Sequence, residues 1–235
     1  MQLFYNSELT EDQHQIQFSK EESRHIIKVL RKTSGDTLSI TNGNGVLFSA
    51  EITIADQKNC IAEIKSVKIQ PKRDYQLHLA VAPTKMNDRF EWFLEKATEI
   101  GIDSITPIFC DNSERRVIKE DRFKKILLSA MKQSLNCYLP VLHKAINFKT
   151  FLQQSHKGKL YIAHCEDTKK VSLKSQLSPK QSTTILIGPE GDFSTNEITL
   201  ALQHNFTPVS LGNNRLRTET AAIVACHSIA FINEL

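Results

Sequence analysis

The first 70 residues contain short stretches in which apolar residues take every second position. Residues 48–54 and 60–64 show this alternation, which is the period of a half-buried strand. Another short strand is predicted over residues 37–40. The sequence Asn-Gly-Asn-Gly at 42–45 follows it and predicts a turn, because both residue types tolerate positive φ. These patterns predict a small β-rich domain over residues 1–70, with a barrel-like sheet.

A short helix is predicted early in this domain. Residues 19–22 read Ser-Lys-Glu-Glu. This is a capping box, in which the Ser19 hydroxyl accepts a bond from the Glu22 backbone and the Glu22 side chain bonds back to Ser19. The helix would carry the apolar residues Ile26, Ile27, Val29 and Leu30.

Basic residues lie along the same stretch. Arg24, Lys28 and Arg31 have i, i+4 and i+7 spacing, which places them in one stripe of an α-helix. His25 and Lys32 lie beside them. Such a stripe suits an RNA backbone, although a solvated helix face is at least as common an explanation.

The chain changes character after a polar break at residues 70–74, which contains Pro71 and marks a domain boundary. Strands are then predicted at 76–82, 105–109, 160–164, 184–187 and 208–211. Helices are predicted at about 90–100 with Gly101 as the stop, at 123–131, from Ser194 with a second capping box to Glu197, and at about 220–233. Alternating strands and helices predict an α/β domain with a mainly parallel sheet over 74–235. Ligands bind such sheets beyond the carboxyl ends of the strands.

Composition and charge leave the function open. The chain has 235 residues, of which 40% are hydrophobic and 24% charged, so a packed core is expected rather than disorder. The net charge of +4 permits an anionic partner such as RNA without demanding one. The five cysteines form no Cys-x-x-Cys pair, which argues against a zinc ribbon and favours a reducing cytosol. Without a signal peptide or a membrane-length apolar stretch, the protein is expected to be soluble and cytoplasmic.

The first candidate binding loop covers residues 187–194, Ile-Gly-Pro-Glu-Gly-Asp-Phe-Ser. It leads from an apolar strand into the capped helix. Gly188 and Gly191 would let the backbone approach a ligand closely, and Pro189 stiffens the turn. Backbone N–H groups held in such a loop can bind an adenine or a carboxylate. A plain strand-to-helix turn explains the pattern equally well, because short Gly motifs are weak signals.

The second candidate loop covers residues 211–220 and again joins a strand to an apolar helix. Arg215, Arg217 and Glu219 crowd together just before that helix. Arginine at a helix start opposes the helix dipole. A ligand or RNA facing these side chains is therefore favoured over simple surface charge.

Several other kinds of site find no support in the sequence. No G-x-G-x-x-G follows the first α/β strand, and there is no P-loop, His-Glu-x-x-His motif or serine hydrolase elbow. These absences argue against a Rossmann dinucleotide site and against phosphate-cradling or zinc-dependent hydrolysis. His164 ends a predicted strand and could line a pocket, although a structural histidine is the more frequent role.

Together the two loops resemble the signature of the SPOUT methyltransferases, and most closely that of the RsmE family. The most specific pieces are Leu-Ile-Gly-Pro-Glu-Gly at 186–191 and Leu-Arg-Thr-Glu-Thr-Ala at 216–221. Similar stretches cover almost the whole chain: 25–31 with Gly35-Asp36, 83–85 through 88–89, 96–101, 113–115 and 133–134. The chain departs from the family pattern at Asp192, where a second Gly is usual, and at Asn214 and Asn136, where Arg is frequent.

The resemblance implies an enzyme that uses S-adenosylmethionine (SAM) to methylate N3 of a uridine in 16S ribosomal RNA, in the 30S subunit. It implies a PUA-like RNA-binding β-barrel domain at 1–70 and a SPOUT domain at 74–235. The C-terminal segment of that α/β domain would be threaded into a deep trefoil knot around the SAM site, which residue patterns alone would not suggest because knots are very rare. It also implies a homodimer that shares the RNA site.

The resemblance further assigns residues to sites. The SAM site is expected to include His164, Ile187, Gly188, Pro189, Glu190, Gly191, Leu211, Gly212, Leu216, Arg217 and Thr218. RNA is expected to contact Arg24, His25, Lys28, Arg31, Lys85, Arg89, Arg115 and Arg215. Arg217 is the expected catalytic residue, stabilising the uracil anion or positioning a phosphate. Glu219 and then Glu190 are candidates for the base, unless they only hold their loops, and no metal is needed because the sulfonium drives the transfer.

Two other functions remain open at this point. One is a SPOUT enzyme with a different RNA target or atom. The other is an RNA-binding ribosome-assembly factor that keeps the fold without catalysis, which the intact loops argue against. A nucleotide hydrolase with Glu190 as base has little support, since no phosphate-cradling motif is present.

Overall fold

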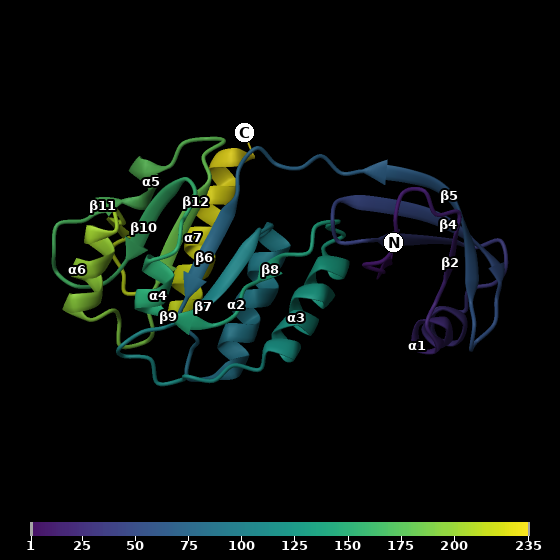
Figure 1. The fold of residues 1–235 in the computed structure, drawn as a ribbon, viewed down its shortest axis with the longest axis horizontal. Coiled ribbons are helices and arrows are strands. Elements are labelled where there is room, and N and C mark those ends of the chain that lie inside the picture. The colour runs from purple at the N-terminus through teal and green to yellow at the C-terminus, as the bar shows by residue number, and fades with distance from the viewer. Residues whose placement is uncertain (1, 235) are drawn as a thin grey trace. The chain divides into compact units, whose positions relative to one another are not determined.

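The structure, a computed structural model, describes residues 2–234. They divide into two compact units. The N-terminal unit comprises residues 2–72 with 131–139, and the C-terminal unit comprises residues 73–130 with 140–234. Figure 1 shows the first as a small β-rich unit and the second as a sheet covered by helices.

The N-terminal unit is built on one five-stranded sheet. Its strands are β1 (Leu3–Tyr5), β2 (Gln15–Gln17), β3 (Thr37–Thr41), β4 (Val46–Ile54) and β5 (Ile61–Ile69), in the order β1-β3-β4-β5-β2. β1 runs parallel to β3, and the other pairs are antiparallel. The alternation predicted for β4 is confirmed, because Phe48, Ala50 and Ile52 are buried, except that Ile54 at its end is 49% exposed.

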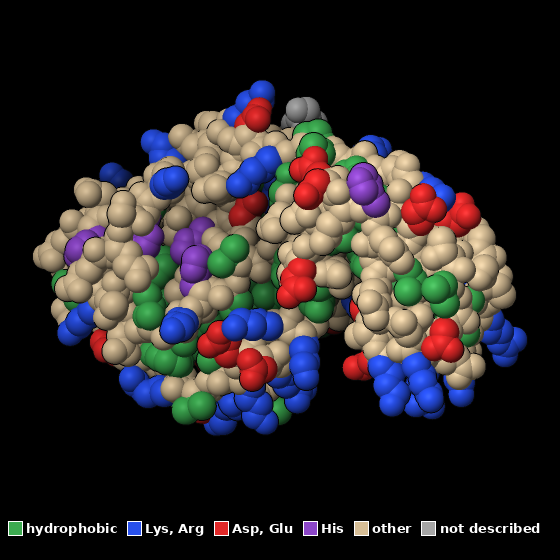
Figure 2. Space-filling model, turned by 45° about the vertical axis from the view of Figure 1, so that its right-hand side comes forward, with side chains coloured by type: hydrophobic (Ala, Val, Ile, Leu, Met, Phe, Trp, Pro, Cys, Tyr) green, Lys and Arg blue, Asp and Glu red, His purple; other side chains and the backbone are tan. Residues whose placement is uncertain are grey.

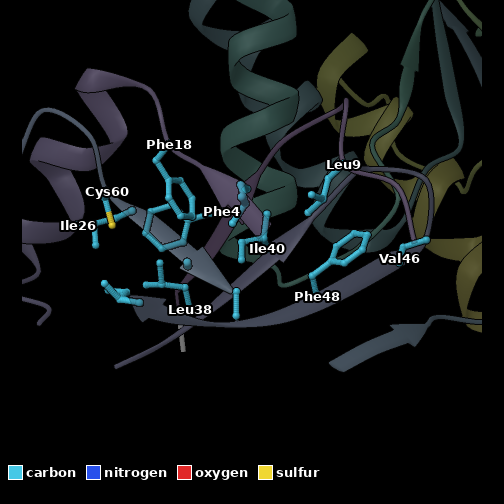
Figure 3. Packing of buried hydrophobic residues seen from close by; sticks show 13 residues of the cluster. Phe4, Leu9, Phe18, Ile26, Leu38, Ile40, Val46, Phe48 and Cys60 are labelled. Carbon is cyan, nitrogen blue, oxygen red and sulfur yellow. The ribbon is translucent and has the colours of Figure 1, made fainter. Parts of the chain in front are cut away.

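Side chains from every strand of this sheet meet in one apolar core (Figure 3). Phe4 of β1 packs edge to face against Phe18, which directly follows β2, with ring centroids 5.7 Å apart. β1 and β2 are the two edge strands of the sheet. Among the described strands the expected barrel is therefore not a closed hydrogen-bonded ring, and aromatic packing links its two edges.

The predicted helix begins where the cap places it. The Ser19 hydroxyl accepts a bond from the Glu22 backbone N–H at 3.2 Å, and α1 (Lys20–Arg24) follows. The return bond from the Glu22 side chain is not among those found in the described part of the chain. Half of the capping box is therefore confirmed.

The stripe of basic residues on this helix is not the one that α-helical spacing predicts. α1 passes directly into a π-helix, η1 (His25–Val29). Arg31 lies beyond its end, with φ +55°. The single-stripe arrangement of Arg24, Lys28 and Arg31 is therefore wrong, because i, i+4 and i+7 positions share a side only in a continuous α-helix. All three side chains are nevertheless exposed.

A segment from much later in the chain, residues 131–139, completes the N-terminal unit. The Tyr138 hydroxyl donates to the Gln70 carbonyl at 2.8 Å, and the Gly45 N–H donates to the Cys137 carbonyl at 2.8 Å. Gly45 has φ +91°, and a Cβ there would lie 2.3 Å from the Tyr138 ring and hydroxyl. Glycine is thus required both by the backbone conformation and by the close approach of Tyr138.

The C-terminal unit alternates strands and helices, as predicted. Its strands are β6 (Leu77–Val81), β7 (Ser104–Phe109), β8 (Val141–Leu142), β9 (Ile146–Asn147), β10 (Lys159–Ala163), β11 (Val171–Ser172), β12 (Thr183–Ile187) and β13 (Thr207–Ser210). Its helices are α2 (Asn87–Ile100), α3 (Glu120–Gln133), α4 (Phe148–Leu152), α5 (Leu173–Gln176), α6 (Thr195–Gln203) and α7 (Thr218–Asn233), of which α3 ends in the N-terminal unit. The sequence periodicity predicts the five longer strands and the four longer helices, but not β8, β9, β11, α4 or α5.

The eight strands form one parallel sheet, which confirms the predicted class. The order is β11-β13-β10-β12-β6-β7-β8, with β9 also paired to β7. Every pair recorded in it is parallel. The carboxyl ends of β13, β10, β12 and β6 therefore lie next to one another along one edge.

Helices cover both faces of this sheet (Figure 1). α7 packs against α2, β6 and β12. On the other face, an apolar cluster that includes Leu186 of β12 packs under α4 and α6 through Phe148, Phe151 and Ile198. β12 (Thr-Thr-Ile-Leu-Ile) is buried along its whole length, which explains why its last three residues are consecutive apolar residues rather than alternating ones.

Two predicted helix ends are confirmed in detail. Gly101 ends α2 with φ +101°, and its N–H donates to the carbonyls of Ala97 and Thr98. Ser194 begins α6 with both bonds of the capping box to Glu197. Among the described residues, no helix is long and apolar enough to cross a membrane.

Candidate active site

A cavity of about 390 Å³ opens in the C-terminal unit. The first loop and its strand contribute Ile187, Gly188, Pro189, Glu190 and Asp192. The second loop and helix α7 contribute Arg215, Leu216, Arg217, Thr218 and Ala221, and Arg89, Ala163 and Cys165 complete the lining. The two loops that the sequence singled out therefore form walls of one cavity.

Sheet topology explains where this cavity lies. Ala163 is the last residue of β10 and pairs with Ile187, the last residue of β12. Both line the cavity. The cavity thus sits beyond the carboxyl ends of adjacent parallel strands, which is where α/β sheets bind ligands.

The two loops are joined by a hydrogen bond. The buried Thr218 hydroxyl, in the first turn of α7, donates to the Gly188 carbonyl at 3.1 Å. This contact links residues 30 positions apart and fixes the start of α7 against the first loop. Arg217 precedes α7 as its N-cap residue, and its exposed side chain makes no capping bond.

The glycines of the first loop serve the packing of the loop itself. A Cβ on Gly188 would lie 3.1 Å from the ring of Phe193, and one on Gly191 would lie 3.1 Å from Cβ of Asn112. Gly188 lines the cavity, whereas Gly191 does not. A side chain at either position would therefore be tightly packed, and its neighbour would have to shift by a few tenths of an ångström.

Asp192 holds the first loop to the segment after β10. Its φ is +64°, a left-handed conformation that Asp adopts more readily than most residues. One carboxylate oxygen accepts from the Cys165 N–H at 2.6 Å, and the other accepts from the Phe193 N–H at 2.8 Å. The Asn112 amide donates to the Asp192 carbonyl at 3.1 Å. The Asp192 carboxylate thus ties two walls of the cavity together.

Within the described residues, one carboxylate oxygen of Glu190 is hydrogen-bonded and the other is not. Its Oε1 accepts from the Lys85 N–H at 2.9 Å. Its Oε2 is buried and has no hydrogen-bond partner among the described residues. The Arg115 guanidinium donates to the carbonyls of Thr84 and Lys85 and so supports the same segment. A buried carboxylate oxygen without a partner is costly, so this atom is suited to accept a bond from a ligand.

Arg89 and Glu219 bring α2 and α7 together at the cavity. Arg89 Nε lies 3.8 Å from Glu219 Oε1. Arg89 lines the cavity, whereas Glu219 is 8% exposed and does not. The second oxygen of Glu219, Oε2, is buried and lacks a hydrogen-bond partner within residues 2–234.

His164 is buried immediately beside the cavity. It lies between two lining residues, Ala163 and Cys165, but is not itself part of the lining. Neither ring nitrogen has a hydrogen-bond partner in the part of the chain that the structure describes. Burial lowers the pKa of His164, and the nearby Lys170 ammonium lowers it further. A neutral imidazole is therefore the favoured form of this side chain.

Comparison with protein-family models identifies both units. A model of the RNA methyltransferase domain matches residues 71–230, and a model of the RNA methyltransferase PUA domain matches residues 18–65. The chain belongs to the RNA methyltransferase family.

Individual relatives extend over nearly the whole chain. Ribosomal RNA small subunit methyltransferase E of Rickettsia conorii is 31% identical, covering 98% of this chain and 95% of its own. The crystal structure of a probable rRNA-methyltransferase from Porphyromonas gingivalis is 40% identical with a TM-score of 0.91, covering 100% of this chain and 99% of its own. A Legionella pneumophila protein, described as a methyltransferase in complex with bound SAM, is 28% identical with a TM-score of 0.86 and covers 98% of this chain and 97% of its own.

Within this RNA methyltransferase, the residues assigned to the SAM site fall into two groups. Those that line the cavity are Ile187, Gly188, Pro189, Glu190, Leu216, Arg217 and Thr218; those that do not are His164, Gly191, Leu211 and Gly212. Gly212 has φ +140° with open space around it, so its glycine is explained by backbone conformation. Two residues assigned to RNA, Arg89 and Arg215, also line the cavity.

The other residues assigned to RNA lie elsewhere. Arg24, His25, Lys28 and Arg31 belong to the N-terminal unit, and the His25 ring is bonded to the Gln2 side chain at 2.8 Å. Figure 2 shows Lys and Arg side chains gathered at one end of that unit. In the C-terminal unit, the Lys85 ammonium forms an exposed ion pair with Glu114 at 2.7 Å, so RNA would have to compete for this cation.

Four lining residues were not assigned from the sequence: Ala163, Cys165, Asp192 and Ala221. Ala163 and Cys165 flank His164 at the end of a predicted strand. Their place at a strand end is the sequence feature that could have indicated them as cavity residues. Ala221 lies in the first turn of α7, and its N–H donates to the Arg217 carbonyl at 2.8 Å. At Asp192 the sequence signal is only a departure from the pattern that the resemblance implies.

Proposed function

We propose that this protein transfers a methyl group from SAM to N3 of a uridine in the 16S ribosomal RNA of the small ribosomal subunit. The observation that carries the proposal is the cavity formed by the two loops, in a chain whose relatives are named as small subunit rRNA methyltransferases. Acting on ribosomes, the enzyme would work in the cytoplasm.

The residues at the cavity fit SAM. The volume of about 390 Å³ lies in the range of small-molecule sites. Ile187, Pro189, Leu216 and Ala221 offer apolar contact for an adenine ring. Glu190 Oε2, buried and without a partner among the described residues, can accept a bond from a hydroxyl or amino group. When bound, SAM supplies a methyl group on a sulfonium whose positive charge drives the transfer.

The protein's own part in the reaction is mainly to orient and to stabilise charge. Uracil N3 must lose its proton to solvent before or as the nitrogen attacks. Negative charge develops on the ring as the proton leaves, and it is consumed as the N–C bond forms and the S–C bond of SAM breaks. Arg217 lines the cavity, and we assign it to stabilise that charge or to position the uridine phosphate. Orientation of the two reactants should provide most of the acceleration.

We also propose that the C-terminal segment is threaded into a trefoil knot around the donor site. β13 lies outside β10 in the sheet, yet α7, which follows it, packs against β12 and β6 nearer the middle. The chain must therefore return past β10, and Thr218 is then bonded to the first loop. Tracing the chain in an experimental structure tests the proposal; a path that pulls straight when both ends are drawn apart would refute it.

We assign RNA binding mainly to residues 1–70 and methyl transfer to residues 74–235. Support comes from the match of a PUA domain model to residues 18–65 and from the exposed cations of the N-terminal unit.

We further propose that the enzyme is a homodimer. Trp92 of α2 and Phe231 of α7 are 46% and 58% exposed, and burial of such side chains against a second copy would be favourable. Sedimentation of the purified protein as a monomer would contradict the dimer.

The deciding experiment is methylation in vitro. The purified protein is incubated with labelled SAM and either 30S subunits or naked 16S RNA, prepared from a strain that lacks the modification. Digestion of the RNA and chromatography of the nucleosides should show 3-methyluridine. Methylation of another atom or base would contradict the proposed specificity, and SAM binding without any transfer would favour a non-catalytic assembly factor.

A further inference from the structure

Three arginines line the cavity, and within residues 2–234 only one of them contacts a carboxylate. These are Arg89, Arg215 and Arg217. Arg89 Nε lies 3.8 Å from Oε1 of Glu219, whereas no ion pair or side-chain hydrogen bond is recorded for the other two. Arg89 is therefore the lining cation whose position is defined by a partner.

The partner belongs to a well-anchored turn of the protein. Glu219 directly follows Thr218, whose hydroxyl is bonded to the Gly188 carbonyl of the first loop. The first turn of α7 is thus tied to the donor loop through Thr218 and contacts α2 through Glu219. Two consecutive residues of one helical turn, Thr218 and Glu219, therefore fix the position of Arg89 relative to the first loop.

The ion pair leaves the outer part of the guanidinium available. The contact involves Nε of Arg89, and within the described structure neither Nη is recorded in a hydrogen bond or ion pair. The two Nη groups can present a planar pair of donors to an anionic ligand. Glu219 itself is not part of the lining.

We propose that Glu219 is a positioning residue that holds the Arg89 guanidinium at the cavity wall, and that Arg89 stabilises the negative charge developing on the acceptor base. This inference rests on the proposed methyl transfer to uracil. Loss of the N3 proton to solvent places negative charge on the ring and its two carbonyl oxygens until the methyl group is transferred. A cation held in place before the reaction stabilises such charge more effectively than one that must first be ordered. Glu219 is accordingly not the base.

The test compares single and double variants at saturating SAM, with kcat measured over a range of pH. Arg89→Met should lower kcat by about 100-fold, the usual effect of removing one preorganised donor. Arg89→Lys should recover only part of this, because an ammonium lacks the planar fork. Glu219→Gln keeps an oxygen that can face Arg89 Nε, and it should lower kcat only about threefold to tenfold without changing the shape of the pH profile.

The double variant distinguishes a positioning residue from a base. If Glu219 acts through Arg89, adding Glu219→Gln to Arg89→Met should cause little further loss. A base would be needed in either background, so a full additional loss, or disappearance of the acidic limb of the pH profile, would overturn the proposal. Glu91→Gln is the matched control, since Glu91 forms a similar ion pair between α2 and α3 with Arg122 at 2.6 Å and lies outside the cavity lining.

Calorimetry with SAM separates failure of this inference from failure of the proposed function. The Kd for SAM should stay within about twofold in Arg89→Met, as one cation directed at the acceptor contributes little to donor binding. A much weaker Kd with unchanged kcat at saturation would assign Arg89 to the donor carboxylate and overturn the inference, while leaving the methyltransferase function intact. If the wild-type enzyme methylated no uridine, the proposed function itself would fail.

Discussion

Thr218 Oγ1 donates a 3.1 Å hydrogen bond to the carbonyl of Gly188, and this contact closes the candidate site. The donor begins α7 and the acceptor follows β12. Thr218 is buried, so the bond is shielded from competing water. It makes two loops that are far apart in sequence into parts of one cavity.

Replacing Thr218 with Val should weaken SAM binding. The substitution keeps the shape of the side chain but leaves the buried Gly188 carbonyl without its partner, at a cost of about 1–3 kcal/mol. Part of that cost should appear as a roughly fivefold to tenfold higher Kd for SAM in calorimetry, because the cavity walls are no longer held together. Thr199→Val is the control, as the exposed Thr199 hydroxyl donates to a backbone carbonyl within α6. Equal effects of the two substitutions would contradict a special role for Thr218.

Replacing Asp192 should separate its backbone conformation from its hydrogen bonds. Asp192→Ala loses the bonds to the Cys165 and Phe193 N–H groups and keeps a Cβ at φ +64°. Asp192→Gly loses the same bonds but adopts this φ without strain. We expect the alanine variant to be less stable than the glycine variant by about 1 kcal/mol, and both to be less stable than wild type. Urea unfolding measures this, and a glycine variant as stable as wild type would show that the carboxylate bonds contribute no more than the relief of backbone strain.

The architecture of the site was largely predictable because its chemistry follows local sequence. The apolar run of β12 and the capping box at Ser194 define where the first loop begins and ends. The same holds for the second loop between β13 and α7. Parallel strands then place both loops at one edge of the sheet, so a shared cavity follows from the class of fold.

What could not be predicted depends on contacts between distant residues. Tyr138 and Cys137 pack with Gly45, and no periodicity relates these positions. Glu219 faces Arg89, 130 positions away along the chain. The π-helix after Arg24 is a further case, because the sequence there satisfies an α-helical pattern equally well. In each case the three-dimensional packing selects among conformations that the local sequence allows.

Replacing Arg217 with Ala should impair methyl transfer more than donor binding. Arg217 is exposed at the cavity and caps no backbone group of α7 through its side chain, so the fold should be little affected. We expect transfer to 30S subunits to fall by about 100-fold and the Kd for SAM to rise by no more than about threefold. Single-turnover methylation and calorimetry measure the two quantities separately. Transfer at the wild-type rate would remove Arg217 from the catalytic role.

Neutralising the cations of the α1–η1 segment should weaken RNA binding. The triple variant Arg24→Gln, Lys28→Gln, Arg31→Gln removes three exposed positive charges. If all three contact phosphates, the magnitude of the slope of log K against log salt should fall by about 2 to 3, since each neutralised phosphate contributes about 0.7 to 0.9.

The control for this variant removes the same charge from another part of the N-terminal unit, with Lys58, Lys65 and Lys68 changed to Gln. These side chains are also exposed. Filter binding to 16S RNA at several salt concentrations should show a larger change for the α1–η1 variant. An unchanged salt slope would place this segment outside the RNA interface.

Acidification should destabilise the C-terminal unit through His78. Burial, with the neighbouring His143 and His156 rings, lowers the pKa of His78 to about 3, and its Nε2 lies 2.8 Å from the Thr106 hydroxyl. Figure 2 shows several His side chains gathered on one face of the larger unit. In the unfolded chain the pKa of a histidine is about 6.5. The unfolded state therefore binds the proton first, and stability is complete above pH 6.5 and decreases as the pH falls toward 3.

Replacing His78 with Gln should make stability less dependent on pH. Below pH 6 the wild-type unfolding free energy should lose up to about 1.4 kcal/mol per pH unit through this residue. The variant should lack that contribution, because glutamine does not titrate, although it loses some stability at neutral pH through imperfect packing. Urea unfolding at pH 5, 6 and 7 measures the slope, with the exposed His227→Gln as control. A slope in His78→Gln as steep as in wild type would show that the acid sensitivity arises elsewhere.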